Sequence, residues 1–209
     1  MSISLRRLLT IGLLAGALTS AHASITWHFV NVVSGDPPDG SDWATLTITD
    51  TGTDQVELTL KHNDTSVSPQ FISELWLNLT DIPGDLSATF SSPISDISWG
   101  DDAFTNTGNQ WDVDVELFTS EGNRLEAGDS VTWTMTGTGL DEQDFNTLST
   151  PEGENIAALG MIHLQAIGGE GSAKITVDEF FPSVPEPASL AALGVGAIAL
   201  LHSRRRRKG

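Results

Sequence analysis

Apolar and polar residues alternate along much of the middle of the chain. In the segment from Trp111 to Leu117, apolar residues alternate with aspartate and glutamate, and from Val131 to Thr136 they alternate with threonine. A period of two places one face of a strand on a core and the other face in water. The same pattern over residues 44–49, 56–61 and 71–79 predicts three more strands.

Other segments are less regular but equally rich in β-forming residues, and we expect strands there as well. They cover residues 25–33, 87–90, 94–99, 156–167 and 174–181. Clusters of Gly, Pro and Asp separate the strands and predict turns. The pattern therefore predicts an all-β, antiparallel β-sandwich of jelly-roll type over residues 24–183. Acidic residues near the start of residues 140–146 predict one short helix, and residues 125–130 are typical of a turn.

The first 23 residues have the three regions of a secretory signal peptide. Arg6 and Arg7 precede an apolar run from Leu8 to Leu18, and the segment ends in Ala21-His22-Ala23. Small residues at Ala21 and Ala23 predict cleavage by signal peptidase after Ala23. As a helix the run would rise only about 16 Å, too little for a hydrocarbon core of about 30 Å, which argues against an uncleaved anchor.

The last part of the chain has the features of a short membrane segment: an uncharged run followed by basic residues. The fourteen residues from Ala188 to Leu201 carry no charge, and we expect a transmembrane helix over 188–201. Five basic residues follow it closely and predict a stop-transfer cluster that stays in the cytoplasm: Arg204, Arg205, Arg206, Arg207 and Lys208. The helix is short and rich in small residues, so it would match the bilayer poorly and make a weak permanent anchor.

Val184, Pro185, Glu186 and Pro187 stand directly before this segment. Residues 184–189, the apolar helix and the basic cluster, in that order, resemble the PEP-CTERM sorting signal of exopolysaccharide-producing Gram-negative bacteria. In that family, the membrane-embedded transpeptidase exosortase recognises the motif and removes the tail.

The resemblance implies three parts within residues 184–209: a recognition element at 184–187, a membrane segment at 188–201 and a stop-transfer cluster at 204–208. The chain would be a substrate of exosortase. It would be held transiently in the inner membrane with a cytoplasmic C-terminus, and would then reach the cell envelope, the surface or the extracellular matrix. An ordinary anchor that is never cut is the alternative. Short matches at residues 71–79, 132–144 and 162–167 also resemble ectodomains of PEP-CTERM proteins, which implies a fold but no activity.

Charge and cysteine content limit what the middle domain can do. Residues 24–183 contain 27 acidic and three basic residues, a net charge of −24. A surface of this kind repels nucleic acid and anionic lipid headgroups, so neither is an expected partner. The chain has no cysteine, so its core alone must stabilise the exported domain.

The sequence predicts no catalytic site. His28, His62 and His163 have no metal-binding spacing, and no Gly-x-Ser-x-Gly motif is present. Acidic residues are too numerous for a glycosidase pair to be singled out, and a hydrolase would need two carboxylates in a cleft. We therefore expect a non-enzymatic surface or matrix protein, processed by exosortase and associated with exopolysaccharide or biofilm.

A calcium- or polysaccharide-binding module is the alternative function. Asp101, Asp102, Asn106 and Asn109 lie in a segment that we expect to be a loop, and oxygen ligands of this kind suit Ca²⁺, although no EF-hand pattern is present. A second acidic loop is expected at residues 36–42. Trp99 and Trp111 flank the first loop and could stack on a sugar. We expect instead that the six tryptophans fill the core, and alternation favours this for Trp111 and Trp133.

Overall fold

The structure is a computed structural model, and it describes residues 23–35, 42–63, 70–167 and 171–177. Ala21 and the predicted sorting segment at 184–209 lie outside these residues, as do the predicted helix at 188–201 and most of the second acidic loop. Among the helices of the described part, none is long and apolar enough to cross a membrane.

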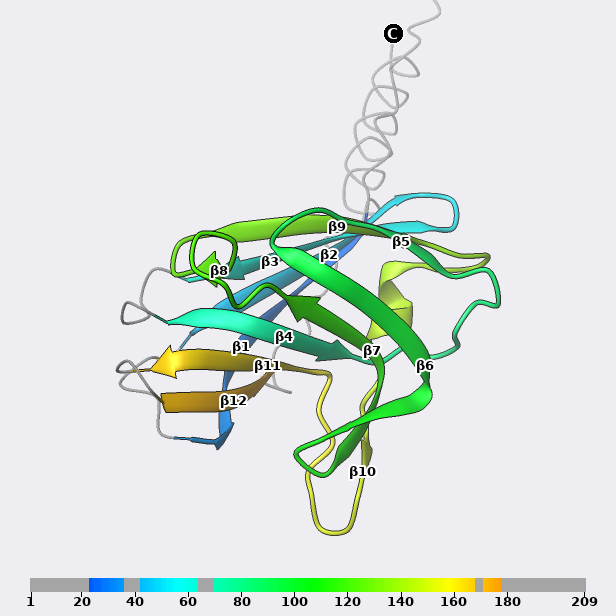
Figure 1. The fold of residues 1–209 in the computed structure, drawn as a ribbon. Coiled ribbons are helices and arrows are strands. Elements are labelled where there is room, and N and C mark those ends of the chain that lie inside the picture. Colours follow the sequence, from blue (N-terminus) through cyan, green and yellow to red (C-terminus); the bar gives the residue numbers. More distant parts are fainter. Residues whose placement is uncertain (1–22, 36–41, 64–69, 168–170, 178–209) are drawn as a thin grey trace, which may run out of the picture.

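The described residues form twelve strands and one short 3₁₀ helix (Figure 1). The strands are β1 (Ser24–Ser34), β2 (Ala44–Gly52), β3 (Gln55–His62), β4 (Phe71–Leu77), β5 (Ser87–Thr89), β6 (Ile94–Asn106), β7 (Asn109–Leu117), β8 (Leu125–Glu126), β9 (Ser130–Thr136), β10 (Thr150–Pro151), β11 (Gly160–Ile167) and β12 (Gly171–Val177). The helix η1 (Glu142–Phe145) begins at a capping box between Asp141 and Asp144, so the prediction of a helix here is confirmed.

Each of the ten predicted strands corresponds to an observed strand. The largest differences are in β6, which extends seven residues beyond the predicted end at Trp99, and in β11, which begins four residues later than predicted. The two-residue strands β8 and β10 were not predicted, and β8 lies where we expected a turn. A strand of only two residues is too short to show an alternating pattern, and it forms because of the strand with which it pairs. Alternation in the sequence therefore does not predict it.

All strand pairs are antiparallel, and hydrogen bonds connect the strands in one open sheet. The order is β10-β7-β4-β11-β12-β1-β2-β3-β9-β5, while β6 pairs with β7 and β8 pairs with β4. The prediction of an antiparallel all-β domain is confirmed. A jelly roll divides its strands between two sheets, whereas hydrogen bonds connect all twelve strands here in one sheet. The finer assignment, a jelly-roll sandwich, therefore stays a prediction.

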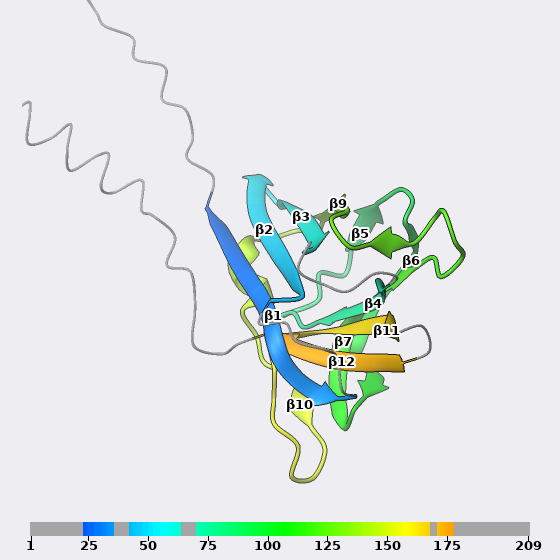
Figure 2. The ribbon, with the colours of Figure 1, turned by 90° about the vertical axis from the view of Figure 1, so that its left-hand side faces the viewer.

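Strand β1 makes the sheet continuous. Its residues 24–29 pair with β2, and its residues 29–34 pair with β12, with two register shifts on the β12 side. Figure 2 shows β1 running from the half that contains β2 and β3 to the half that contains β11 and β12. One apolar cluster draws on both halves, including Leu46 and Leu58 from one and Leu75, Val115 and Ile162 from the other. The two halves therefore share a single main core.

A second apolar cluster lies outside this core. It contains Trp76, Trp111, Ala158 and Met161, with the partly buried Phe104 packed against them. Trp76 stands between Leu75 and Leu77, which belong to the main core, so its side chain points to the opposite face of β4. Residues from the end of the β6–β7 hairpin and from the segment before β11 cover Trp76. The face of the sheet opposite the main core is therefore buried at this point.

Candidate functional site

The recognition residues Val184, Pro185, Glu186 and Pro187 lie outside the described residues, and so do Arg204 to Lys208. The last described residue is Val177, which ends β12 and pairs with Phe29 of β1. Seven Cα steps separate Val177 from Val184, so the two Cα atoms are at most about 25 Å apart. The last described residue therefore lies close to the predicted recognition element.

The predicted signal cleavage point adjoins the first strand. Ala23 is described, and its carbonyl oxygen accepts a hydrogen bond of 2.9 Å from the backbone N–H of Asp50. Ser24 is the first residue of β1 and pairs with Thr49. A cut after Ala23, which stays a prediction, would leave Ser24 as the first residue of both the mature chain and the sheet.

The expected calcium loop is mostly strand, so that part of the prediction is wrong. Residues 100–106 belong to β6, and only Thr107 and Gly108, with φ of 51° and 71°, form the turn to β7. The pairing with β7 is interrupted between Trp99 and Phe104. A bulge of this kind accommodates extra residues in a strand without ending it, and the alternation pattern gave no signal for it.

The four calcium candidates do not converge. Asp101 and Asp102 are exposed in the bulge, whereas Asn106 and Asn109 pair across the hairpin end. The side-chain oxygen of Asn106 accepts a hydrogen bond from the Lys174 ammonium group. Within the described ranges, no group of three or more His, Cys, Asp and Glu residues is placed to hold a metal ion. Calcium binding at these positions stays a prediction.

Five of the six tryptophans are buried, in line with the expectation that they fill the core: Trp27, Trp43, Trp76, Trp111 and Trp133. Trp111 is fully buried, so its ring presents no face to a ligand. Trp99 on β6 is 36% exposed and is the exception. The predicted stacking surface therefore reduces to one partly exposed ring.

Charged side chains form a row across five neighbouring strands on the face opposite the main core. The register places Asp96 of β6 opposite Glu116 of β7, Glu116 opposite Glu74 of β4, and Glu74 opposite His163 of β11. Lys174 of β12 ends the row opposite His163. Three carboxylates thus stand side by side at one end, and the two groups that can carry positive charge stand at the other.

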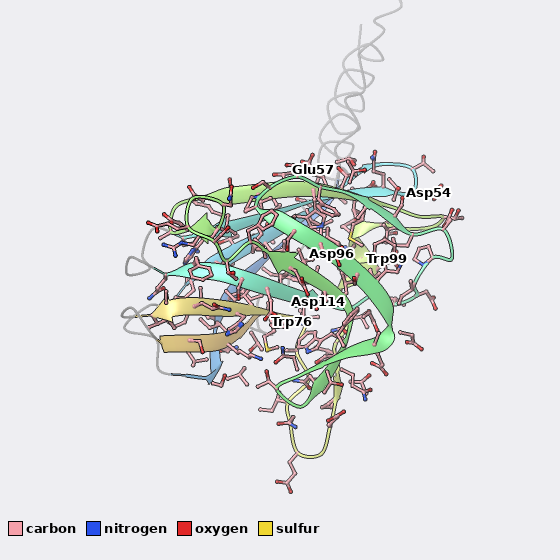
Figure 3. All side chains as sticks on the ribbon, in the orientation of Figure 1. Asp54, Glu57, Trp76, Asp96, Trp99 and Asp114 are labelled. Carbon is pink, nitrogen blue, oxygen red and sulfur yellow. The ribbon has the colours of Figure 1, made fainter. Side chains whose placement is uncertain are left out.

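Asp114 lies next to this row on β7, between Trp76 of β4 and Ser98 of β6 (Figure 3). Partial burial, together with the nearby charges of Glu74, Glu116 and Asp96, raises the pKa of Asp114 to about 6. Its Oδ1 atom has no hydrogen-bond partner among the described residues. The alternating acids of β7 are visible in the sequence, but their cross-strand neighbours are not, so the sequence alone does not single out Asp114.

His163 and Lys174 in this region contact aromatic and acidic neighbours. The His163 Nδ1–H donates to Glu74 Oε2 at 2.9 Å, and the His163 ring stacks on Trp76 with centroids 6.5 Å apart. The Lys174 ammonium group lies 5.1 Å from the centroid of the Trp76 ring. These contacts join β4, β11 and β12 to the hairpin end, where Asn106 accepts from Lys174.

The other two histidines of the domain also have structural contacts. His62 is fully buried, and its Nδ1–H donates to the Leu125 carbonyl oxygen at 3.2 Å. Burial lowers the pKa of His62 and keeps the ring neutral. His28 lies 2.8 Å from the Asp42 carboxylate.

Comparison with known proteins gives one result. The family model described as the PEP-CTERM protein-sorting motif matches residues 183–207. No curated protein and no solved structure shows significant similarity to the chain. The matched residues include all four predicted recognition residues and the four arginines of the stop-transfer cluster. The chain therefore carries the PEP-CTERM protein-sorting motif at residues 183–207, which indicates a secreted protein that is targeted by exosortase.

Proposed function

We propose that the protein is a non-enzymatic surface or matrix component, which exosortase cuts from the inner membrane and which associates with exopolysaccharide outside the cell. The observation that carries the proposal is the match at residues 183–207, which begins six residues after the end of β12. In this proposal the folded domain is the cargo that the sorting motif delivers.

The composition of the motif supports processing over permanent anchoring. If residues 188–201 form a helix, its fourteen residues rise about 21 Å, well short of a hydrocarbon core of about 30 Å. Two prolines, Pro185 and Pro187, favour an extended backbone directly before it, and an extended segment is accessible to a transpeptidase. The net charge of −24 over residues 24–183 favours a domain that remains in water after release.

Three side chains that could act as acids or bases, His163, His62 and Asp112, make structural contacts instead, which supports a role without catalysis. The His163 ring is bound to Glu74 and stacked on Trp76, and the His62 ring is buried and neutral. The two carboxylate oxygens of Asp112 accept backbone N–H groups of Leu79 and Asp102. Side chains that make such contacts stabilise the fold.

The test is an intact mass measurement of the protein from cells that contain exosortase, combined with fractionation of those cells. We expect a mature protein without Arg204 to Lys208, recovered outside the inner membrane. A strain that lacks exosortase should retain the tail, and so should Glu186→Ala. Retention of Arg204 to Lys208 on every molecule from the exosortase-containing cells would overturn the processing part of the proposal.

A further inference from the structure

Lys174 of β12 and Asn106 of β6 meet at the end of the β6–β7 hairpin, although 68 positions separate them in the sequence. The Lys174 ammonium group donates to Asn106 Oδ1, so its nitrogen lies next to the carboxamide carbon of Asn106. A lysine amine is a nucleophile that can attack a carbonyl carbon. The contact therefore brings together a nucleophile and the acyl group with which it can react.

Asn106 is fixed through both its main chain and its side chain. Its main-chain carbonyl oxygen accepts a hydrogen bond of 3.4 Å from Trp111 Nε1. Its side-chain Oδ1 accepts from Thr107 Oγ1 at 3.1 Å as well as from Lys174. The other acceptor within reach of the Thr107 hydroxyl is Met161 Sδ at 3.3 Å, and sulfur is the weaker acceptor. Donors at the carbonyl oxygen stabilise the negative charge that develops there when a nucleophile attacks the carbon.

Apolar side chains lie beside the contact between the two groups. The Lys174 Nζ atom is 5.1 Å from the centroid of the Trp76 ring, and Trp76 belongs to the second apolar cluster together with Trp111 and Met161. Burial lowers the pKa of Lys174. An amine must lose its proton before it attacks a carbonyl carbon, so this environment favours the reactive form.

Glu74 can accept the proton that Lys174 must lose. The register places His163 opposite both Lys174 and Glu74, and His163 Nδ1 lies 2.9 Å from Glu74 Oε2, which fixes the carboxylate. The charge of Glu74 raises the pKa of Lys174, against the effect of burial, so the carboxylate acts on the ammonium group. A carboxylate placed in this way can serve as a general base.

We propose that Lys174 and Asn106 form an intramolecular isopeptide bond after the domain has folded. Glu74 takes one proton from the Lys174 ammonium group, and the neutral Nζ attacks Cγ of Asn106. As the Nζ–Cγ bond forms, Nζ gives up a second proton. Nδ2 gains a proton and leaves as ammonia when the Cγ–Nδ2 bond breaks, and the proton on Glu74 passes to water. The step needs no oxidant, reductant or cofactor, and the contacts described above are those of the chain before the bond forms.

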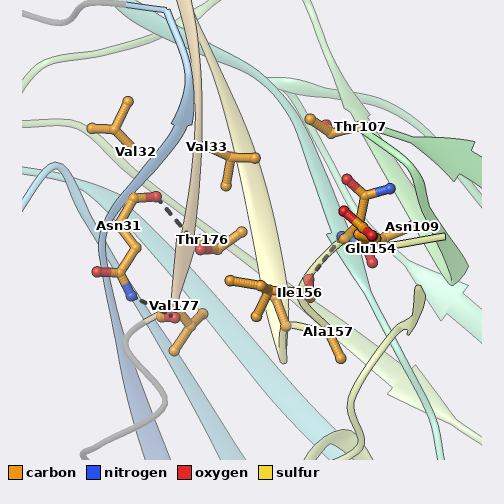
Figure 4. Close-up of a pocket in the computed structure, with 12 residues that line it drawn as sticks. Asn31, Val32, Val33, Thr107, Asn109, Glu154, Ile156, Ala157, Thr176 and Val177 are labelled. Atoms are coloured by element: carbon orange, nitrogen blue, oxygen red, sulfur yellow. Dashed lines mark hydrogen bonds between the residues drawn. The ribbon is translucent and has the colours of Figure 1, made fainter. Parts of the chain in front are cut away.

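The leaving group has open space beside the reacting carboxamide. Thr107, which donates to Asn106, also lines a hollow of about 630 Å³ where the ends of β1 and β12 meet the β6–β7 turn (Figure 4). Ammonia is smaller than any side chain and can leave through this hollow.

The bond joins β12 covalently to the hairpin end in a chain that has no cysteine. A cross-link between distant residues stabilises a domain mainly because it restricts the unfolded chain. The reaction occurs once in each chain and modifies the chain itself, so it is compatible with a non-enzymatic function. It goes beyond the proposed function and does not depend on it, because none of the reacting residues belongs to the sorting motif.

The test is mass spectrometry of tryptic peptides from the full-length chain, purified in detergent from the producing cells. Residues 24–183 contain three sites for trypsin, Lys61, Arg124 and Lys174, and trypsin does not cut after an acylated lysine. We expect peptide 62–124 joined to a peptide that begins at Leu125 and continues past Lys174. The joined peptide should weigh about 17 Da less than the sum of its two parts, because one ammonia has been lost.

Lys174→Arg and Asn106→Ala should each abolish the joined peptide. Lys61→Arg is the matched control, because it keeps a trypsin site and changes an exposed residue of β3, and it should form the joined peptide at the parent level. In Glu74→Gln, the amount of joined peptide at a fixed time after synthesis should fall at least tenfold, while near-UV circular dichroism stays that of the folded parent.

Complete cleavage after Lys174 in the parent protein would overturn the proposal. A joined peptide that persists in Lys174→Arg would also overturn it, because the link would then involve another residue. Unchanged joining in Glu74→Gln would refute the role of Glu74 as the base.

Discussion

The Asp112 carboxylate accepts a hydrogen bond of 2.8 Å from the backbone N–H of Asp102, a residue with a positive φ of 48° in the β6 bulge. Its second oxygen accepts a hydrogen bond of 3.0 Å from the backbone N–H of Leu79. Asp112 is only 7% exposed. One buried side chain thus fixes the bulge of the hairpin to the segment that follows β4.

Replacing Asp112 by alanine should lower the free energy of unfolding by about 2–4 kcal/mol, because two backbone N–H groups lose their acceptor. Urea denaturation followed by tryptophan fluorescence measures the loss. Asp101→Ala is the control: the residue is exposed in the same bulge, and we expect a change within about 0.5 kcal/mol. Equal effects of the two substitutions would contradict the role given to Asp112.

Asp114 should make stability depend on pH. Its pKa is about 6 in the folded protein, against an ordinary value of 3.8. Between these values the folded state binds more protons than the unfolded state, so the contribution of this group to stability is fully present below about pH 4. It is lost as the pH rises to about 6 and stays lost above that.

Asp114→Asn should therefore flatten the fall in stability between about pH 4 and 6. At pH 7 the variant should be more stable than the parent by about 1–2 kcal/mol, a figure reduced for the solvent screening of a half-exposed group. Urea midpoints across this pH range give the measurement. Asp101→Asn removes the same charge away from the row and should leave the slope unchanged. An unaltered slope in Asp114→Asn would refute the assignment.

Lys174 should hold the end of the β6–β7 hairpin on the sheet. Its ammonium group lies over the Trp76 ring and donates to Asn106, and together these contacts contribute about 1–3 kcal/mol. In Lys174→Ala, hydrogen exchange at residues 104–110 should be faster by about tenfold or more. Lys61→Ala removes an exposed positive charge from β3 and should leave exchange in the hairpin unchanged. Similar exchange in both variants would count against this role.

Gly108 should tolerate an added side chain less well than Gly122 does. Its φ is +71°, and an added Cβ would collide with the side chain of Asn155. Gly122 has a φ of +85°, but no other atom lies within 4 Å of an added Cβ. Alanine at Gly122 should therefore cost about 1–2 kcal/mol from the backbone conformation alone, and alanine at Gly108 should cost clearly more. Thermal unfolding compares the two, and equal costs would mean that Asn155 moves away freely.

Much of the fold could be predicted from the chain because alternation has a local cause. In β7 and β9, side chains at every second position face the main core, so residues 113–117 and 131–135 show their burial in their own sequence. The bulge in β6 could not be found in this way, because it depends on Asp112 accepting from Asp102. Asp114 was missed for a similar reason, since Glu74 and Asp96 become its neighbours only through strand register.

The sorting motif at residues 183–207 and the antiparallel β character of the domain can both be recognised from the order of residues along the chain. Both are local: a sorting motif is defined by a linear order of residues, and strand periodicity extends over a few neighbours. The continuous sheet and the second apolar cluster, in contrast, follow only from the three-dimensional fold. These depend on contacts between distant residues, such as Asn31 and Thr176, which are 145 positions apart. Such contacts are set by strand order and register, and no local pattern encodes them.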